Sequence, residues 1–411
     1  MRGASPLLRR PFSRLSDVAG GALDIGGIGV FDADPGADYV ATDGRILKAS
    51  DYPDIGKVLP LTGGMAPISL SRSPVVVYNG LAAAGDYALF MTDQRDMVMT
   101  SKDGGDTFQI VPLKNTSGDS PYTLPGRIHA VACDPTGLIQ IAATDGVTAN
   151  STGTPACAIS TDGGQSFVAR QLGNLGATAG PVHWLGGQFN GFAVGTTSGG
   201  YNGFDLRRAS GAPLTFNTAS TTGNITAIDI NPDSGAVVLS GTQTAGLARY
   251  GNLFSSQSAS GFPLSGSTIH QIKYRAGLWL VCTGNGIYRS TDDGQNFTIV
   301  PGTSGITFYT IAYSSGKWIA IASSNSARDA YILPSDATSA VLAANFIGPT
   351  GGGYSNSLLQ AGNKYLMTIA LSNPAQVFRS ASTDPSAKFA VTPNLPSTGL
   401  ILPKRYYMRA K

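Results

Sequence analysis

One eight-residue motif occurs three times in the chain, and it constrains the fold more than any other feature. It reads SKDGGDTF at residues 101–108, STDGGQSF at residues 160–167 and STDDGQNF at residues 290–297. All three copies fit the pattern Ser-x-Asp-x-Gly-x-(Thr, Ser or Asn)-Phe. A motif that recurs in one chain predicts an architecture assembled from similar supersecondary units.

The composition favours strands and turns over helices. Glycine accounts for 53 of the 411 residues, and all 25 acidic residues are aspartate, so glutamate is absent. Glutamate favours helices, whereas aspartate and glycine favour turns. Together with frequent Val, Ile, Tyr and Phe, this bias predicts an all-β chain of many short strands joined by tight turns.

Longer repeats surround the motif. Seven stretches consist of an apolar strand, a turn and a second apolar strand, for example IHQIKYRAGLWLVCTG at residues 269–284. A third strand leads into the motif and a fourth leaves from its Phe. Seven phenylalanines mark the ends of these units: Phe108, Phe167, Phe216, Phe254, Phe297, Phe346 and Phe389.

Four strands per unit and seven units of about 40 to 60 residues are typical of a β-propeller. We therefore expect one propeller over residues 61–411 and an extended N-terminal arm over residues 1–60. Seven four-stranded blades is the expected number, with six or eight as the alternatives. We also expect the C-terminal segment 398–411 to pair with the blade near residues 75–77. This pairing would close the ring and leave no sheet edge open.

The octet resembles the Asp box of the sialidase-like, BNR-repeat propellers, where it forms a turn between the third and fourth strands of a blade. The resemblance and the residue types together imply a structural role for each position. Ser closes the local hydrogen-bond network, Asp accepts from turn N–H groups, Gly adopts a positive φ, and Phe fills the gap between blades, worth roughly 2 to 3 kcal/mol. The residues concerned are Ser101, Asp103, Gly105, Phe108, Ser160, Asp162, Gly164, Phe167, Ser290, Asp292, Gly294 and Phe297.

A sialidase-type glycoside hydrolase is the enzymatic alternative. The resemblance would imply an arginine triad, an acid/base Asp and a Tyr nucleophile activated by Glu. The chain has no Glu, and glycosidases generally need two carboxyl groups beside the scissile bond. No pair of aspartates stands out in the sequence, so we expect no catalytic residues and no enzymatic activity.

Histidine and cysteine are sparse, and we expect structural roles for both. His129, His183 and His270 are each expected near the start of the innermost strand of a blade, where they can bond a neighbouring strand or line the channel. A metal held by several of them is the alternative. The three cysteines, Cys133, Cys157 and Cys282, show no metal-binding or disulfide spacing and are expected to be small buried hydrophobes. No metal or cofactor is expected.

The segment before the propeller has a different character. Residues 43–55, DGRILKASDYPDI, resemble the Asp-Gly and Tyr-Pro pattern of phage tail-collar and tail-fibre segments. The Trp and Cys that often precede Asp-Gly in that family are missing. The alternative is an ordinary strand, turn and short helix. The resemblance implies a docking element, with Asp43, Gly44, Tyr52 and Pro53 as candidate docking residues.

Three functions therefore compete. The first is a non-enzymatic virion protein of a phage tail or adsorption apparatus, assembled in the host cytoplasm. It would contact other virion proteins through residues 1–60, form a homo-oligomer in the particle, and present a scaffold or a module for a host surface glycan. The others are a non-viral carbohydrate-binding propeller and the hydrolase. A net charge of +3 with 13% charged residues disfavours nucleic acid as a partner, and no apolar run is long enough to span a membrane. The collar-like segment favours the first.

Overall fold

The structure is a computed structural model of the 411-residue chain. None of the residues it describes is helical. The described residues are 28–31, 39–41, 46–48, 52, 61–62, 65–68, 80–92, 94–144, 157–170, 179–184, 191–196, 201–205, 213–214, 225–231, 237–242, 246–250, 264, 266–314, 316–323, 328–347, 355–369, 376–380, 389–391 and 405–409.

The chain divides into two compact units. The larger unit is Met65–Ser386, and the smaller one combines the two ends of the chain, Met1–Gly64 and Ala387–Lys411. The expected division placed everything after residue 60 in the propeller. The N-terminal boundary lies close to that expectation, but the last 25 residues belong to the smaller unit.

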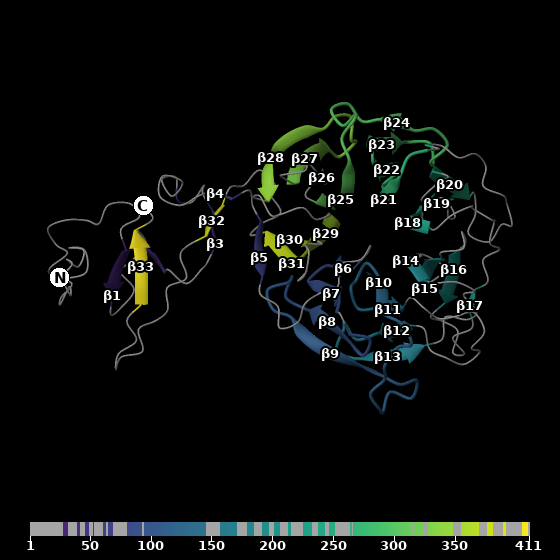
Figure 1. The fold of residues 1–411 in the computed structure, drawn as a ribbon, viewed down its shortest axis with the longest axis horizontal. Helices are drawn as coiled ribbons and strands as arrows, with labels where there is room; N and C mark the ends of the chain where they lie inside the picture. The colour runs from purple at the N-terminus through teal and green to yellow at the C-terminus, as the bar shows by residue number, and fades with distance from the viewer. Residues whose placement is uncertain are drawn as a thin grey trace, which may run out of the picture. The chain divides into compact units, whose positions relative to one another are not determined.

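The larger unit is a seven-bladed β-propeller, as the repeats predict. Its blades follow one another around a ring (Figure 1). Blade 1 contains β6 (Leu81–Ala84), β7 (Tyr87–Met91), β8 (Met97–Ser101) and β9 (Gln109–Lys114). Blade 2 contains β10 (Ile128–Cys133), β11 (Gln140–Thr144), β12 (Cys157–Ser160) and β13 (Phe167–Arg170).

The next two blades continue the antiparallel order. Blade 3 contains β14 (Ala179–Trp184), β15 (Gly191–Thr196), β16 (Tyr201–Asp205) and β17 (Pro213–Leu214). The strands described for blade 4 are β18 (Ile225–Asn231), β19 (Val237–Thr242) and β20 (Gly246–Tyr250). Phe216 and Phe254, which were expected to mark the ends of these units, lie outside the described residues.

The last three blades complete the ring. Blade 5 contains β21 (Ile269–Arg275), β22 (Leu278–Thr283), β23 (Gly286–Ser290) and β24 (Thr298–Ile299). Blade 6 contains β25 (Phe308–Ser314), β26 (Lys317–Ser323), β27 (Arg328–Pro334) and β28 (Val341–Ile347). Blade 7 contains β29 (Ser355–Ala361), β30 (Lys364–Ile369), β31 (Gln376–Ser380) and β5 (Met65–Ile68).

The ring closes through β5 and not through the C-terminus, so the expected closure is wrong. β5 pairs antiparallel with β31, from Ile68 opposite Val377 to Met65 opposite Ser380. An N-terminal strand thus supplies the outermost position of the last blade. Phe389 was expected to begin that strand, but it lies in the smaller unit. Residues 75–77 lie outside the described residues.

The smaller unit consists of two three-stranded sheets, each of which joins strands from both ends of the chain. In the first sheet, β33 (Arg405–Arg409) lies between β1 (Ile28–Phe31) and β2 (Tyr39–Ala41). In the second, β32 (Phe389–Val391) lies between β3 (Ile46–Lys48) and β4 (Leu61–Thr62). The C-terminal segment is therefore paired with the expected arm.

The hydrophobic core of the propeller lies between blades. Strand side chains alternate between the two faces of each sheet, so a blade can pack apolar residues against the blades on either side. One cluster joins Ala142 of blade 2 to Leu89 of blade 1, and another joins Trp279 of blade 5 to Leu247 of blade 4. Equivalent clusters link blades 2 and 3, 5 and 6, 6 and 7, and 7 and 1.

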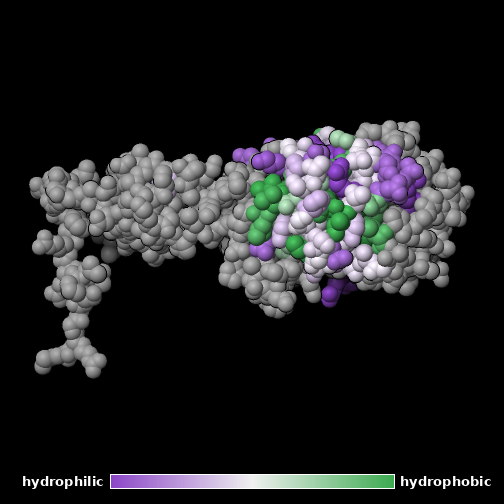
Figure 2. Space-filling model, turned by 90° about the horizontal axis from the view of Figure 1, so that it is seen from above, coloured by the Kyte–Doolittle hydropathy of each residue, from purple (hydrophilic) through white to green (hydrophobic). Residues whose placement is uncertain are grey.

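Two large apolar side chains are exposed at the outer edge of blade 6. Val341 is 64% exposed and Leu342 is 52% exposed at the start of β28. Figure 2 shows apolar residues grouped on the side of the propeller where β28 lies, next to mixed and hydrophilic residues. β28 is the outermost strand in the order of its sheet.

Candidate functional site

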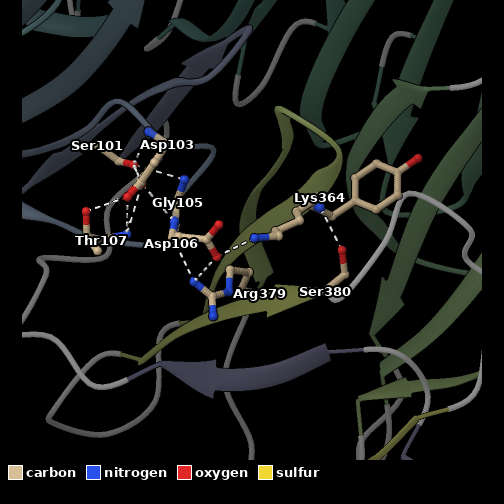
Figure 3. Close-up of polar contacts among 9 residues, drawn as sticks. Ser101, Asp103, Gly105, Asp106, Thr107, Lys364, Arg379 and Ser380 are labelled. Atoms are coloured by element: carbon tan, nitrogen blue, oxygen red, sulfur yellow. Dashed lines mark hydrogen bonds and ion pairs between the residues drawn. The ribbon is translucent and has the colours of Figure 1, made fainter. Parts of the chain in front are cut away.

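The first octet forms a closed turn between β8 and β9. The hydroxyl of Ser101 donates to Asp103 Oδ1 at 2.7 Å and accepts from the N–H of Gly105 at 2.9 Å. The same carboxylate accepts from the N–H groups of Asp106 at 3.0 Å and Thr107 at 2.9 Å (Figure 3). Ser101 and Asp103 therefore find their partners within the turn itself.

The other two octets repeat this network atom for atom. Asp162 accepts from Ser160 at 2.8 Å, and Asp292 accepts from Ser290 at 2.7 Å. The seventh residue of each motif also donates its side chain to the Asp, through Thr107, Ser166 and Asn296. This shared bond explains why the seventh position is Thr, Ser or Asn, and it confirms the roles predicted for Ser and Asp.

These hydrogen bonds hold the Asp side chains in their charged form. Burial alone would raise the pKa of Asp103, but its hydrogen bonds from Thr107, Ser101 and Asp106 lower the pKa to about 2. Backbone and side-chain hydrogen bonds from Asn296 and Ser290 lower the pKa of Asp292 to about 2. Because a carboxylate that accepts several N–H bonds is stabilised as the anion, the pKa shifts follow from structural roles.

Glycine is required where each turn approaches the preceding blade. Gly105 has φ of 83°, as predicted, and a Cβ there would lie 2.8 Å from Leu366 of blade 7. Gly164 has φ of 81°, and a Cβ would lie 2.8 Å from Thr100 of blade 1. The third copy also has a positive φ at Gly294, 74°. A side chain at the fifth position would strain the backbone in all three turns, and at Gly105 and Gly164 it would also collide with a side chain of the preceding blade.

Each octet also bonds to the preceding blade through one backbone carbonyl. Arg379 of blade 7 donates to Gly105 O at 2.7 Å, Thr100 of blade 1 to Gly164 O at 3.2 Å, and Arg249 of blade 4 to Asp293 O at 2.7 Å. All three donors occupy the penultimate position of the third strand in their blade. These donors could not be predicted from the sequence, because they belong to a different repeat from the motif they serve.

The motif phenylalanines lie in the interblade clusters, as predicted, but they differ in burial. Phe167 is fully buried between blades 2 and 1. Phe108 packs partly buried between blades 1 and 7, where its ring meets Phe90 edge-on at 5.0 Å. Phe297 packs partly buried between blades 5 and 4. The three octets are therefore structural turns that join blades 1, 2 and 5 to the blades that precede them. We call these turns interblade staples.

The staple at the junction of blades 1 and 7 is reinforced by charge. Asp106, in the first octet, receives Arg379 Nη1 at 2.9 Å and the ammonium group of Lys364 (Figure 3). Arg379 lies on β31 and Lys364 on β30, both in blade 7. The two cations therefore bind the first blade to the last, at the place where the ends of the propeller chain meet.

The innermost strands form a second set of links around the channel. Each link joins a side chain of one blade to the backbone of the next. Thr226 of blade 4 donates to Ile269 O at 2.9 Å. Thr310 of blade 6 accepts from Leu358 N at 2.9 Å. Side chains of one blade thereby provide hydrogen-bond partners for backbone groups on the channel side of the next blade.

Among the described side chains, His183 forms a polar contact with a neighbouring blade. His183 Nε2 lies 2.7 Å from Asp229 Oδ1, which joins β14 to β18. Asp229 also accepts from Tyr274 N of blade 5 at 2.7 Å. Burial alone would raise the pKa of Asp229, but His183, Lys273 and the Tyr274 N–H lower it. This buried carboxylate connects three consecutive blades.

The predicted equivalence of the three histidines is wrong for His183. His129 and His270 occupy the second position of their strands, where the register with the second strand shifts at a bulge. His183 is the fifth residue of β14, in regular pairing with Ala193. Burial lowers the pKa of His270 to about 4, and its ring lies 4.5 Å from that of Tyr309.

A cavity of about 140 Å³ lies in the channel. Its lining comes from six of the seven innermost strands, β6, β10, β14, β18, β21 and β29. The polar side chains among the lining residues are those of His183, Gln271 and Lys273, and Trp184 and Cys133 also line it. Within the described part of the chain, no cluster of three potential metal ligands is found.

The remaining predicted residues are placed as follows. Cys157 and Cys282 are fully buried, as expected, and burial raises the pKa of both thiols. Cys133 is a free thiol of intermediate exposure with a pKa raised by burial to about 12. Of the docking candidates, Tyr52 is half-buried, while Asp43, Gly44 and Pro53 lie outside the described residues. Among the described residues there is no helix long and apolar enough to cross a membrane.

No protein-family model and no curated protein matches the sequence. The fold, in contrast, matches solved structures. YCF48 from Cyanidioschyzon merolae has a TM-score of 0.54 at 14% identity, covering 77% of this chain and 98% of that chain. YCF48 bound to D1 peptide has a TM-score of 0.54 at 12% identity, with 78% and 95% covered.

A chain of the crystal structure of the mitotic checkpoint complex gives a TM-score of 0.57 at 12% identity, covering 85% of this chain and 95% of that chain. At such low identities, the likeness shows the fold alone. It agrees with the strand order in identifying the larger unit as a seven-bladed β-propeller.

Proposed function

We propose that this chain is a non-enzymatic structural protein of a bacteriophage virion, in the tail or adsorption apparatus. In this role the propeller is a rigid scaffold or a host-surface binding module, and the protein assembles in the host cytoplasm. Other virion proteins are its partners through residues 1–60, further copies of the chain are partners in the particle, and a host glycan is the candidate external ligand.

The observation that carries the proposal is the separate unit built from both chain ends. Its two three-stranded sheets contain strands of only two to five residues. Sheets this small bury little apolar surface and gain most from packing against something else. The collar-like residues 43–55 fall within this unit. The resemblance to a docking segment and the separate compact unit therefore concern the same part of the chain.

The propeller supports a structural role from a different direction. The serines and aspartates of its repeated motif are all engaged in turn networks, and the adjoining carbonyls accept bonds from the preceding blade. Their carboxylates are thus committed to holding the ring together. A mechanically tied ring suits a particle component that must keep its shape during assembly and adsorption.

Mass spectrometry of purified phage particles tests the proposal. Peptides of this chain should be present at a constant ratio to known tail proteins, and cross-links should connect residues 1–64 with another virion protein or with a second copy. Absence of the chain from intact particles would contradict the virion role. Release of fluorophore from a fluorogenic sialoside by the purified protein would contradict the non-enzymatic part and favour the hydrolase.

A further inference from the structure

The central cavity contains a cation that no described residue neutralises. Lys273 lies on β21 and is partly buried in the lining. Among the residues that the structure describes, none forms a hydrogen bond or ion pair with its ammonium group. A partly buried ammonium group without a partner has lost hydration and gained no compensating bond.

Asp229, which interacts electrostatically with Lys273, already has other partners. Asp229 accepts from His183 at 2.7 Å, from Tyr274 N at 2.7 Å and from Ile230 N at 2.8 Å. Lys273 attracts Asp229 and lowers its pKa, but the two do not form an ion pair. Asp229 is also absent from the cavity lining, where Lys273 carries the only permanent charge among the described residues.

A second donor points the same way as Lys273. Gln271 precedes it by two residues on β21, and residues two apart in a strand share a face. The side-chain oxygen of Gln271 accepts from Ile311 N at 2.5 Å, which fixes the amide. Its NH₂ group forms no bond with the residues described by the structure. An amide with its oxygen occupied offers only donors to a ligand.

The size and shape of the cavity limit what it can hold. A cavity of about 140 Å³ has room for on the order of ten water molecules. Trp184 supplies an apolar wall, and its indole is fixed by Phe192, which it meets edge-on at 4.9 Å. The site is thus suited to a small molecule and too small for a polymer chain.

We propose that the central channel binds a small ligand carrying one anionic oxygen group, held by Lys273 Nζ and Gln271 Nε2. The shared chemistry is an oxyanion, supplied by an inorganic phosphate, by a small phosphate ester or by a carboxylate. The ligand replaces the water that would otherwise solvate the ammonium group. The site differs in position from the interblade staples, and it does not depend on the virion role.

Isothermal titration calorimetry on the full-length protein tests this proposal. The probes are inorganic phosphate, glycerol phosphate and acetate, with glycerol as the uncharged control, all at constant ionic strength. We expect saturable binding of at least one anionic probe and none of glycerol. Preference for inorganic phosphate, glycerol phosphate or acetate identifies which source of the oxyanion the cavity accepts.

Variants connect the binding to the cavity. Lys273→Met keeps the aliphatic stem and should weaken binding about tenfold or more, the loss expected for a hydrogen bond to a charged group. Lys273→Arg should retain most of it. Lys317→Met removes an exposed lysine on the hairpin of blade 6 and should change nothing.

Thermal unfolding provides an independent readout. The preferred probe should raise the Tm of the wild type and of K317M, because a ligand bound only to the folded state stabilises it, and should leave the Tm of K273M unchanged. The proposal is overturned if no anion binds, or if K273M binds as well as the wild type. Binding that K317M weakens as much as K273M indicates a diffuse surface effect and also overturns it.

Discussion

Replacement of Phe167 by alanine tests the view that the repeated octet joins neighbouring blades. Phe167 is fully buried among apolar residues of blades 1 and 2, including Leu113 and Val131. Its removal leaves a cavity between two blades that are joined by the parallel pairing of β13 with β9 and cannot easily collapse. Substitutions of this kind cost about 3 to 5 kcal/mol, and we expect the upper part of that range.

Phe297→Ala is the matched control. The ring occupies the same position in its octet but is only partly buried, so part of its apolar area already faces water in the folded state. We expect a loss of about 1 to 2 kcal/mol, following the smaller area removed from water. Both values are measured by urea unfolding followed by tryptophan fluorescence, with unchanged m values showing that the unfolding transition is the same. A loss for Phe297→Ala equal to or larger than that for Phe167→Ala would refute the reasoning.

Three further predictions concern the polar links. Asp103 and Asp292 have folded-state pKa values of about 2 against about 3.9 in an unfolded chain. Their stabilising effect is therefore present above pH 4 and is lost as the pH falls towards 2. The urea midpoint should fall over that interval, and it should fall by less in the D103N/D292N double variant. Arg379→Met should lower the free energy of unfolding by about 1 kcal/mol, and its difference from wild type should shrink in high salt. An unchanged urea midpoint would show that the contacts of Arg379 with the first octet contribute nothing to stability. Asp229→Ala should cost about 3 kcal/mol, since it removes the buried acceptor shared by donors of three blades, and a wild-type melting curve would contradict that role.

The octet geometry could be predicted from sequence because its network is local. Ser101, Asp103, Gly105 and Thr107 bond within a span of seven residues, so residue types and spacing carry all the information. The interblade burial of the Phe side chains follows from the same register. The number of blades could be predicted from seven copies of one hairpin pattern, including the copies that lack a complete octet.

Ring closure could not be predicted in the same way. The partner of β31 is β5, which lies at the other end of the propeller sequence, and either chain end could supply the missing outer strand. The sequence near Phe389 retains Ser382 and Asp384 of the octet and so suggested a fourth strand there. In the structure β32 instead pairs with β3 and β4. Non-local pairing of short strands leaves little trace in local composition.

The channel residues illustrate a second limit. His183 was aligned with His129 and His270 because each follows a β-branched residue near the expected start of an innermost strand. A shift of a few positions along a strand is invisible in such a short pattern, yet it places His183 beside Asp229 instead of at a bulge. The donors Thr100, Arg249 and Arg379 were missed because their acceptors belong to the next repeat.

The most direct test of the proposed function is incorporation of a variant that lacks the terminal unit. Removing residues 1–64 and 387–411 leaves the propeller with both β5 and β31, so its ring remains closed. Circular dichroism should show a folded β protein, and mass spectrometry of purified particles should show the full-length chain but not this variant. A folded variant incorporated as well as the full-length chain would contradict the docking role of the terminal unit.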